Sequence, residues 1–200
     1  MEEQFYNLDT RERITLVREA VAAGQPLMIR WAEVEPNFGE RWRPRAAAAA
    51  EWLAAAATIV DLGCGSMTLA GCLRPEQRYV PVDLARRDLG TIVLDLNKAA
   101  DLERLPAADA CALLGVLEYI YGPQELIGAL RRRYGQVVAT FNVRRDGESA
   151  EDRLGHGWVN HFTRDELLSL FGRHGYALAR DHLFEGRRQE YLFDLRRIQI

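Results

Sequence analysis

Five short apolar runs divide the chain from residue 58 onward. Runs of this length, bounded by glycine, proline or polar residues, are typical of strands buried on both faces of a parallel sheet. The segments between the later runs have the spacing of amphipathic helices. The pattern therefore predicts an α/β fold of the doubly wound, Rossmann-like type. The runs are Thr58–Leu62, Arg78–Val82, Thr91–Leu94, Asp109–Leu114 and Gln136–Phe141.

The end of the chain predicts a helix followed by a hairpin. Thr163 and Glu166 have the spacing of a capping box at a helix start, and Gly175 ends that helix. Two further apolar runs, Tyr176–Phe184 and Gln189–Ile198, flank a polar turn and predict an antiparallel pair. With this C-terminal hairpin we expect a mostly parallel sheet of seven strands.

The N-terminal quarter is predicted to be helical. Asp9 and Glu12 form a second capping box, and the helix they start runs to Ala23. Residues 27–34 are compatible with a short strand or an extended arm, and the alanine-rich stretch 46–57 favours a helix. We expect one domain with two segments, an N-terminal helical cap, 1–57, and a core, 58–200.

One connection in the predicted sheet is short. Only residues 84–90 separate the second and third strands. A parallel crossover normally needs a dozen residues or more. Either the crossover helix is reduced to a single turn, or the strand boundaries differ from those predicted.

The turn after the first strand carries the first chemical signal. Gly63 and Gly65 permit a tight turn in which the backbone approaches a ligand closely. Asp61 precedes them, and a carboxylate there is unfavourable beside a phosphate but favourable beside a cation. S-adenosylmethionine carries an ammonium and a sulfonium and no phosphate, so it suits this turn.

These residues resemble the first motif of the class I S-adenosylmethionine-dependent methyltransferases, acidic-x-Gly-x-Gly-x-Gly, with Met67 at the third glycine. The run Gly115-Val-Leu-Glu-Tyr119 is similar to a second segment of that family, in which histidine is common where Tyr119 stands. The dinucleotide fingerprint matches less well, because its third glycine falls on Thr68. The resemblance covers the chain from Thr58 onward and implies a Rossmann-like methyltransferase fold.

The expected cofactor site follows from the strand ends. Asp83 lies twenty positions after Gly63, the spacing at which a carboxylate accepts both hydroxyl protons of a ribose. The resemblance implies that Asp95 accepts a hydrogen bond from the adenine amine; otherwise it caps a turn. The expected cofactor-binding residues are Asp61, Gly63, Cys64, Gly65, Asp83, Leu84, Asp95, Leu96, Gly115 and Glu118.

Methyl transfer from a sulfonium requires alignment of the acceptor, and a base only if the acceptor bears a proton to be removed. The candidates for such catalytic roles are His161, His156 and Tyr119. His161 precedes the capped helix and is the first choice, although a surface or capping role fits it equally well. His156 lies between two glycines of a long loop that could close on a substrate. No metal is expected.

Four aromatic residues of the N-terminal segment could line a substrate lid. Packing against the core is the alternative role for each of them. They are Tyr6, Trp31, Phe38 and Trp42.

Composition narrows the functional classes. The 200 residues include 48% hydrophobic residues, enough for one domain with a core, and the formal net charge of −3 argues against a general nucleic-acid surface. The three cysteines lack metal-ligand spacing. We expect no leader peptide and no membrane span, hence a cytoplasmic protein, either a monomer or a homodimer.

The sequence therefore predicts S-adenosylmethionine-dependent methyl transfer to an oxygen or nitrogen of a small metabolite or natural-product intermediate. Two other functions remain compatible with it. One is a catalytically silent S-adenosylmethionine-binding homologue or partner subunit, and the other is an NAD-dependent oxidoreductase.

Overall fold

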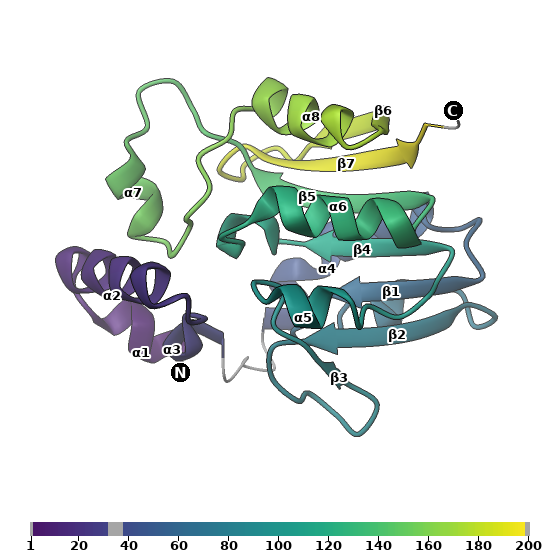
Figure 1. Cartoon of the computed structure of the whole chain (residues 1–200), viewed down its shortest axis with the longest axis horizontal. Coiled ribbons are helices and arrows are strands. Elements are labelled where there is room, and N and C mark those ends of the chain that lie inside the picture. Colours follow the sequence, from purple (N-terminus) through teal and green to yellow (C-terminus); the bar gives the residue numbers. More distant parts are fainter. Residues whose placement is uncertain (1, 32–37, 199–200) are drawn as a thin grey trace.

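Seven strands form one sheet in the computed structural model, which describes residues 2–31 and 38–198. The strand order is β3-β2-β1-β4-β5-β7-β6, with parallel pairing from β3 to β5 and antiparallel pairing of β7 with both of its neighbours (Figure 1). The predicted fold class is confirmed. The strands are β1 (Thr58–Leu62), β2 (Arg78–Asp83), β3 (Ile92–Val93), β4 (Ala110–Leu114), β5 (Gln136–Asn142), β6 (Tyr176–Leu183) and β7 (Glu190–Arg197).

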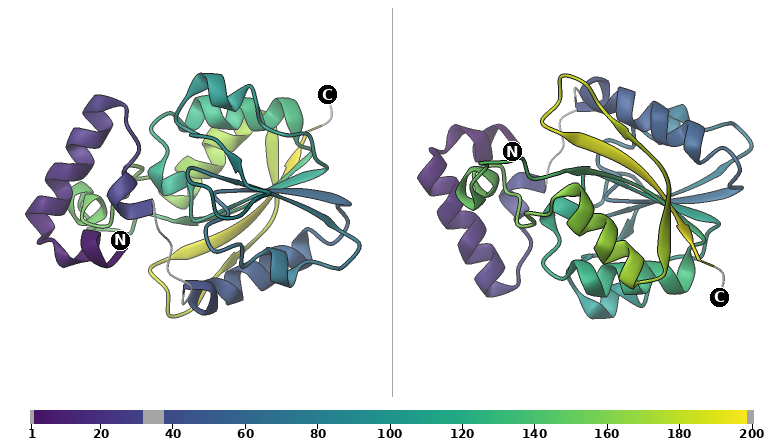
Figure 2. Two further views of the ribbon diagram at one scale, coloured as in Figure 1. Left: turned by 90° about the horizontal axis from the view of Figure 1, so that it is seen from below. Right: turned by 90° about the horizontal axis from the view of Figure 1, so that it is seen from above.

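Helices cover both faces of the sheet, as Figure 2 shows from two sides. One face packs against α5 (Ala99–Leu102), α6 (Pro123–Arg133) and α8 (Arg164–Arg173), and the other against α4 (Phe38–Trp52). Successive strand residues point to opposite faces. In β4, Cys111 therefore joins the core beneath α6, whereas its neighbour Ala112 joins the core beneath α4.

The link between β2 and β3 contains no helix. Residues 84–91 form bends and a turn, in which the Thr91 hydroxyl donates to Asp88 at 2.7 Å. The short link was expected, but the strand predicted over 91–94 is reduced to two residues. A link of this length cannot carry a helix across the sheet, so β3 is a minimal edge strand.

The N-terminal segment contains α1 (Glu2–Asn7), α2 (Thr10–Ala23) and α3 (Met28–Trp31). The capping box of Asp9 and Glu12 is present at the start of α2, as predicted. The prediction of a strand or extended arm over 27–34 is wrong for residues 28–31, which are helical, and residues 32–34 lie outside the described residues.

The alanine-rich helix α4 is displaced from its predicted range. It begins at Phe38 instead of residue 46 and ends at Trp52 instead of residue 57. Its alanines pack on the sheet, where Ala46 and Ala49 are buried. The helix ends early because the chain has to turn back into β1 at Thr58, and residues 53–55 form that turn.

The helices α1 to α3 lie beyond the carboxyl ends of the parallel strands, at the left of Figure 1. There they adjoin α7 (Ala150–Leu154), and Arg18 of α2 pairs with Glu151 of α7 at 3.1 Å. Helix α7 lies in the long loop expected around His156, and a capping box of Ser149 and Asp152 starts it. The N-terminal helices and α7 thus together cover the carboxyl ends of the parallel strands.

Within the described residues, no helix is both long and apolar enough to cross a membrane.

Candidate functional site

The sheet divides at β1 and β4. From β1 the chain proceeds to β2 and β3 on one side, while β4 leads to β5 on the other, so the turns after β1 and β4 separate and leave a crevice. Gly63 follows β1 and Gly115 follows β4, both with positive φ, and both line the cavity at this point. A Cβ on Gly63 would lie only 2.4 Å from Cγ2 of Val116. The close packing of the two turns therefore requires a glycine at position 63.

The third position of the glycine motif keeps a glycine-like backbone without a glycine. Met67 has φ of 54°, beside 77° at Gly63 and 51° at Gly65. Left-handed backbone is uncommon for a residue with a Cβ. The Met67 side chain does not line the cavity, so the departure from the family motif leaves the shape of the crevice intact.

Three aspartates lie at or just beyond the ends of β1, β2 and β3. Asp61, Asp83 and Asp95 are all buried and all line the cavity. Carboxylates at a buried, glycine-lined turn form a site for a ligand with cationic or hydrogen-donating groups, not for a phosphate.

Asp61 is the most deeply buried of the three, with 3% of its surface exposed. Its carboxylate accepts a hydrogen bond from the Tyr79 hydroxyl at 2.8 Å. Burial raises the pKa of Asp61 to about 7, and the nearby Asp83 carboxylate adds to that rise, while Tyr79 and Arg45 oppose it. A bound cation would favour the ionised form of this carboxyl.

Asp83 is fixed by contacts on both oxygens. The Gly65 N–H donates to Oδ2 at 2.8 Å, and Arg87 pairs with Oδ1 at 2.7 Å. Arg87 also donates to the Trp31 carbonyl at 2.7 Å. The carboxylate expected to bind a ribose is thereby held in the cavity and linked, through one guanidinium, to the end of α3.

Asp95 has one oxygen without a hydrogen bond from any residue that the structure describes. Its Oδ1 accepts from the Asn97 N–H at 3.0 Å, and Lys98 approaches its Oδ2 at 3.5 Å. That Oδ2 is buried and has no hydrogen-bond partner within the described ranges. The apolar side chains of Leu84 and Leu96 line the cavity beside it. An acceptor between apolar walls fits the edge and faces of an adenine ring.

The structure brings nine of the ten expected cofactor-binding residues to this one cavity. Glu118 is the exception and lines a neighbouring cavity instead. The nine are Asp61, Gly63, Cys64, Gly65, Asp83, Leu84, Asp95, Leu96 and Gly115.

The neighbouring cavity lies beyond β4 and β5. It is lined by residues of the N-terminal helices, the start of α4, the segment after α7 and the turn between β6 and β7. The two cavities share five lining residues and are therefore adjacent. The shared residues are Trp31, Trp42, Arg45, Gly115 and Tyr119.

Glu118 is 1% exposed at the wall of this second cavity. Its Oε1 accepts from both the backbone N–H and the side-chain amide of Asn142, at 2.9 and 2.8 Å. Burial raises the pKa of Glu118, and the Asn142 bonds partly offset that rise. The carboxyl group thus joins the end of β4 to the end of β5.

Tyr119 and His156, two of the three candidate catalytic residues, line the second cavity. The Tyr119 hydroxyl accepts from Trp158 Nε1 at 3.1 Å, and burial raises its pKa. His156 contacts Arg188, and burial together with the Arg188 charge lowers its pKa to about 4. At neutral pH the phenol keeps its proton, whereas the imidazole is uncharged.

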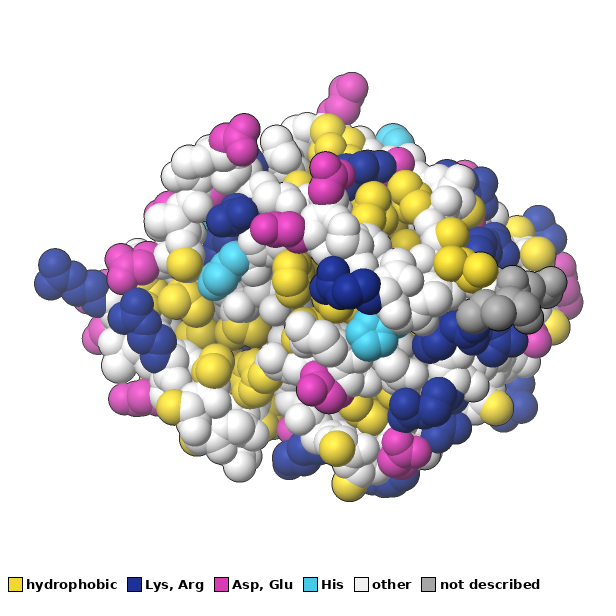
Figure 3. All heavy atoms as spheres, turned by 45° about the horizontal axis from the view of Figure 1, so that its top comes forward, with side chains coloured by type: hydrophobic (Ala, Val, Ile, Leu, Met, Phe, Trp, Pro, Cys, Tyr) yellow, Lys and Arg dark blue, Asp and Glu magenta, His cyan; other side chains and the backbone are white. Residues whose placement is uncertain are grey.

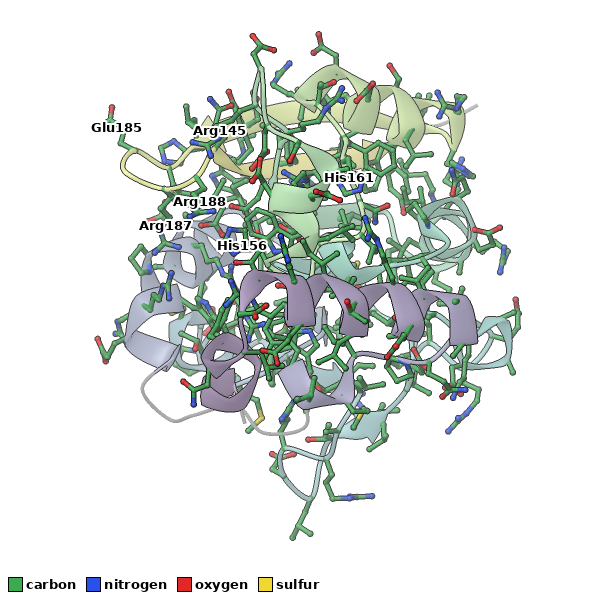
Figure 4. All side chains as sticks on the ribbon, turned by 90° about the vertical axis from the view of Figure 1, so that its left-hand side faces the viewer. Arg145, His156, His161, Glu185, Arg187 and Arg188 are labelled. Carbon is green, nitrogen blue, oxygen red and sulfur yellow. The ribbon has the colours of Figure 1, made fainter. Side chains whose placement is uncertain are left out.

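His161, the first choice from the sequence, lines neither cavity. It lies on the segment between α7 and α8, apart from His156 in Figure 4. Burial and the charges of Arg153 and Arg144 lower its pKa.

Two arginines for which no role was predicted from the sequence lie at the site. Arg45 is mostly buried, pairs with Glu190 at 2.9 Å and donates to the Leu114 carbonyl at 3.1 Å. Arg87 holds Asp83. Arg45 and Glu190 are 145 positions apart in the sequence, so no local pattern could have paired them.

Three of the four aromatic residues expected to line a substrate lid do line a cavity. Trp31 and Trp42 line both cavities, and Tyr6 lines the second. The side chain of Phe38 lies outside the described residues. Hydrophobic side chains gather over the N-terminal helices and α7, at the left of Figure 3, with basic side chains and a histidine around them.

In the described part of the chain, no group of three or more histidines, cysteines or acidic residues is arranged to hold a metal ion.

No family model matches the chain, and no curated protein matches it either. Solved methyltransferase structures share its fold. The mitomycin 7-O-methyltransferase MmcR is 16% identical with a TM-score of 0.63, over 96% of this chain and 70% of that one. Magnesium protoporphyrin IX methyltransferase from Synechocystis PCC 6803, with bound SAH, is 16% identical with a TM-score of 0.61, over 80% and 84%.

A third structure is the 1,6-didemethyltoxoflavin-N1-methyltransferase of Burkholderia thailandensis, with its substrate and S-adenosylhomocysteine bound. It is 14% identical with a TM-score of 0.59, over 78% of each chain. The chain therefore has the fold of the class I S-adenosylmethionine-dependent methyltransferases, as its sequence motifs implied.

Proposed function

We propose that this protein transfers a methyl group from S-adenosylmethionine to an oxygen or nitrogen of a small molecule. The observation that carries the proposal is the set of three buried aspartates, Asp61, Asp83 and Asp95, around a crevice of close-packed glycines. Each carboxylate suits a different part of the cofactor, and none of them suits a phosphate.

The residues fit the cofactor one by one. Asp61 would face the ammonium of its methionine part, because burial makes this carboxylate most responsive to a cation. Asp83 would accept the ribose hydroxyls, and Asp95 Oδ2 the adenine amine. Gly63 and Gly115 leave the backbone approach that the ligand requires. When bound, S-adenosylmethionine supplies an activated methyl group on a sulfonium.

The acceptor would occupy the second cavity, because five of its lining residues also line the first. Trp31 and Tyr119 lie at this boundary, with ring centroids 4.8 Å apart, and would exclude water and hold the acceptor in line with the methyl group. We assign the proton-accepting role to His156 Nδ1, since the imidazole is neutral and lines this cavity while its Nε2 contacts Arg188.

Calorimetric titration and turnover test the proposal together. We expect S-adenosylhomocysteine to bind in the micromolar range or tighter and NAD not to bind. Methyl transfer from labelled S-adenosylmethionine to at least one member of a panel of hydroxylated and amino-substituted small molecules is then expected. Binding of NAD without S-adenosylhomocysteine would favour the oxidoreductase. Tight S-adenosylhomocysteine binding with no methylated product from any acceptor would favour the catalytically silent protein.

A further inference from the structure

The second cavity differs in charge from the rest of the molecule. Five arginines line it, against two glutamates, although the whole chain has a formal net charge of −3. The arginines come from three separate segments: α3, the start of α4, and the turn between β6 and β7. They are Arg30, Arg41, Arg45, Arg187 and Arg188.

Neither glutamate pairs with Arg41 or Arg188 within the described residues, although Oε2 of Glu118 is buried without a hydrogen-bond partner. Glu190 pairs with both Arg45 and Arg187, at 2.9 and 2.8 Å. Glu118 uses one oxygen for Asn142. These carboxylates hold the wall together and do not neutralise the cations at its entrance.

Arg41 and Arg188 are those entrance cations. Both side chains are exposed, and neither forms an ion pair within the parts of the chain that the structure describes. Arg188 instead contacts the ring of His156, which the added positive charge helps to keep neutral. In Figure 4, Arg187 and Arg188 lie on the same side as His156, while Glu185 at the tip of the turn points away.

The same cavity is rich in aromatic rings. Trp31 packs edge-on against Tyr119, with an interplanar angle of 81°, and Trp158 donates to the Tyr119 hydroxyl. Trp42 carries the Arg45 guanidinium over its ring at 5.0 Å from the centroid. The Arg30 guanidinium covers one face of Trp31 at 4.1 Å from the centroid, so a flat ligand would meet the edges or the opposite faces of these rings.

We propose that the methyl acceptor is an aromatic carboxylate, with its ring between Trp31, Trp42 and Tyr119 and its carboxylate at Arg41 and Arg188. This inference rests on the proposed function and narrows it to a substrate class. Arginine is the residue best suited to bind a carboxylate, because its planar fork donates two parallel hydrogen bonds. An uncharged aromatic acceptor would leave the guanidinium groups of Arg41 and Arg188 without a negative partner.

The test measures acceptor binding to protein saturated with S-adenosylhomocysteine. The probes are 4-hydroxybenzoate and 3-hydroxy-2-naphthoate, compared with their methyl esters and with cyclohexanecarboxylate. We expect at least one aromatic carboxylate to bind about tenfold or more tightly than its ester and than the saturated acid, since one charge-assisted contact accounts for about that factor.

Two variants test where the carboxylate of the acceptor binds. The double substitution R41Q/R188Q should weaken binding of the aromatic carboxylate about tenfold and leave binding of its ester unchanged. Arg173→Gln is the matched control, because this exposed arginine lies on α8 and lines neither cavity. Its affinity for the carboxylate should equal that of the wild type.

The outcomes separate the two proposals. If S-adenosylhomocysteine does not bind, the proposed function fails. If it binds while carboxylates bind no better than their esters, or while R41Q/R188Q binds them as the wild type does, the acceptor proposal fails, and turnover with the panel of small molecules decides the proposed function separately.

Discussion

The two cavities share a wall but have opposite chemistry. The first is lined by three buried aspartates, by leucines after β2 and β3, and by Arg45 and Arg87. The second is lined by five arginines, Arg45 among them, and by two glutamates, and three aromatic residues line both. Arg45 lies at their boundary, bonded to Glu190 on one side and to the end of β4 on the other. Under the proposed function, the first cavity would take the cationic cofactor and the second the anionic acceptor.

This difference in charge would, under the proposed function, direct the cofactor and the acceptor to separate cavities. A cationic cofactor is favoured beside Asp61 and disfavoured among the arginines, and an anionic acceptor has the reverse preference. The sheet supplies the first cavity, because its carboxylates come from adjacent strand ends. The second depends on segments from both ends of the chain, which meet only in the folded protein.

The largest expected effect on the first cavity is the loss of S-adenosylhomocysteine affinity in Asp83→Ala. The substitution removes the proposed acceptor for two ribose hydroxyls and leaves the Arg87 cation in the cavity. We expect the calorimetric affinity for S-adenosylhomocysteine to fall about a hundredfold, because hydrogen bonds to a charged group contribute roughly 1.5–3 kcal/mol each.

Two controls belong to this measurement. Asp165→Ala, at a site 91% exposed on α8, should bind S-adenosylhomocysteine as the wild type does. Circular dichroism should confirm that the Asp83 variant is folded. An unchanged dissociation constant for a folded Asp83→Ala protein would contradict the ribose assignment.

A smaller effect is expected from pH. Since the pKa of Asp61 is about 7 in the folded protein, a cationic ligand that binds the ionised form must displace a proton at lower pH. The affinity for S-adenosylmethionine should therefore fall below pH 7, by up to about tenfold per pH unit, and level off above it. The His156 pKa of about 4 keeps that ring neutral in this range.

The raised pKa of Asp61 also determines how the stability of the unliganded protein changes with pH. A carboxyl whose pKa is raised on folding stabilises the fold below its ordinary pKa, and this contribution is lost as the pH rises through about 7. Asp61→Asn should remove both pH dependences. Titrations at pH 5.5 to 8.5 check this, and a wild-type affinity that does not change with pH would refute the pairing of Asp61 with the ammonium.

The smallest effect is expected from Met67→Gly. Glycine relieves the left-handed strain but makes the unfolded chain more flexible, so the change in the free energy of unfolding should stay below about 1 kcal/mol. S-adenosylhomocysteine affinity should stay within about twofold, since the side chain does not line the cavity. Urea denaturation and calorimetry check both, and a tenfold gain in affinity would mean that Met67 obstructs the ligand.

The sequence predicted best what local patterns determine. The parallel strands, the hairpin and the capping boxes at Asp9 and Thr163 depend on neighbouring residues, and the structure contains all of them. Asp83 lines the cavity as expected because its position follows from being at the end of a strand. Strand ends and glycine turns therefore sufficed to predict which residues meet at the first cavity.

The parts that failed depend on tertiary contacts. Helix α3 spans four residues, too few for a periodic signal, and a short strand or an extended arm was predicted in its place. The second cavity escaped prediction for the same reason, because Arg41 and Arg188 are far apart in the sequence. His161 was favoured by its place before a capped helix, which says nothing about the direction of its side chain.

The turn at Met67 bears on how this motif should be recognised in other chains. Three alternate positions, Gly63, Gly65 and Met67, share the sign of φ although only two share a residue type. Methionine is unbranched at Cβ and so tolerates this backbone better than valine or isoleucine would. A search for three glycines overlooks such a chain, whereas one for the handedness of the turn finds it.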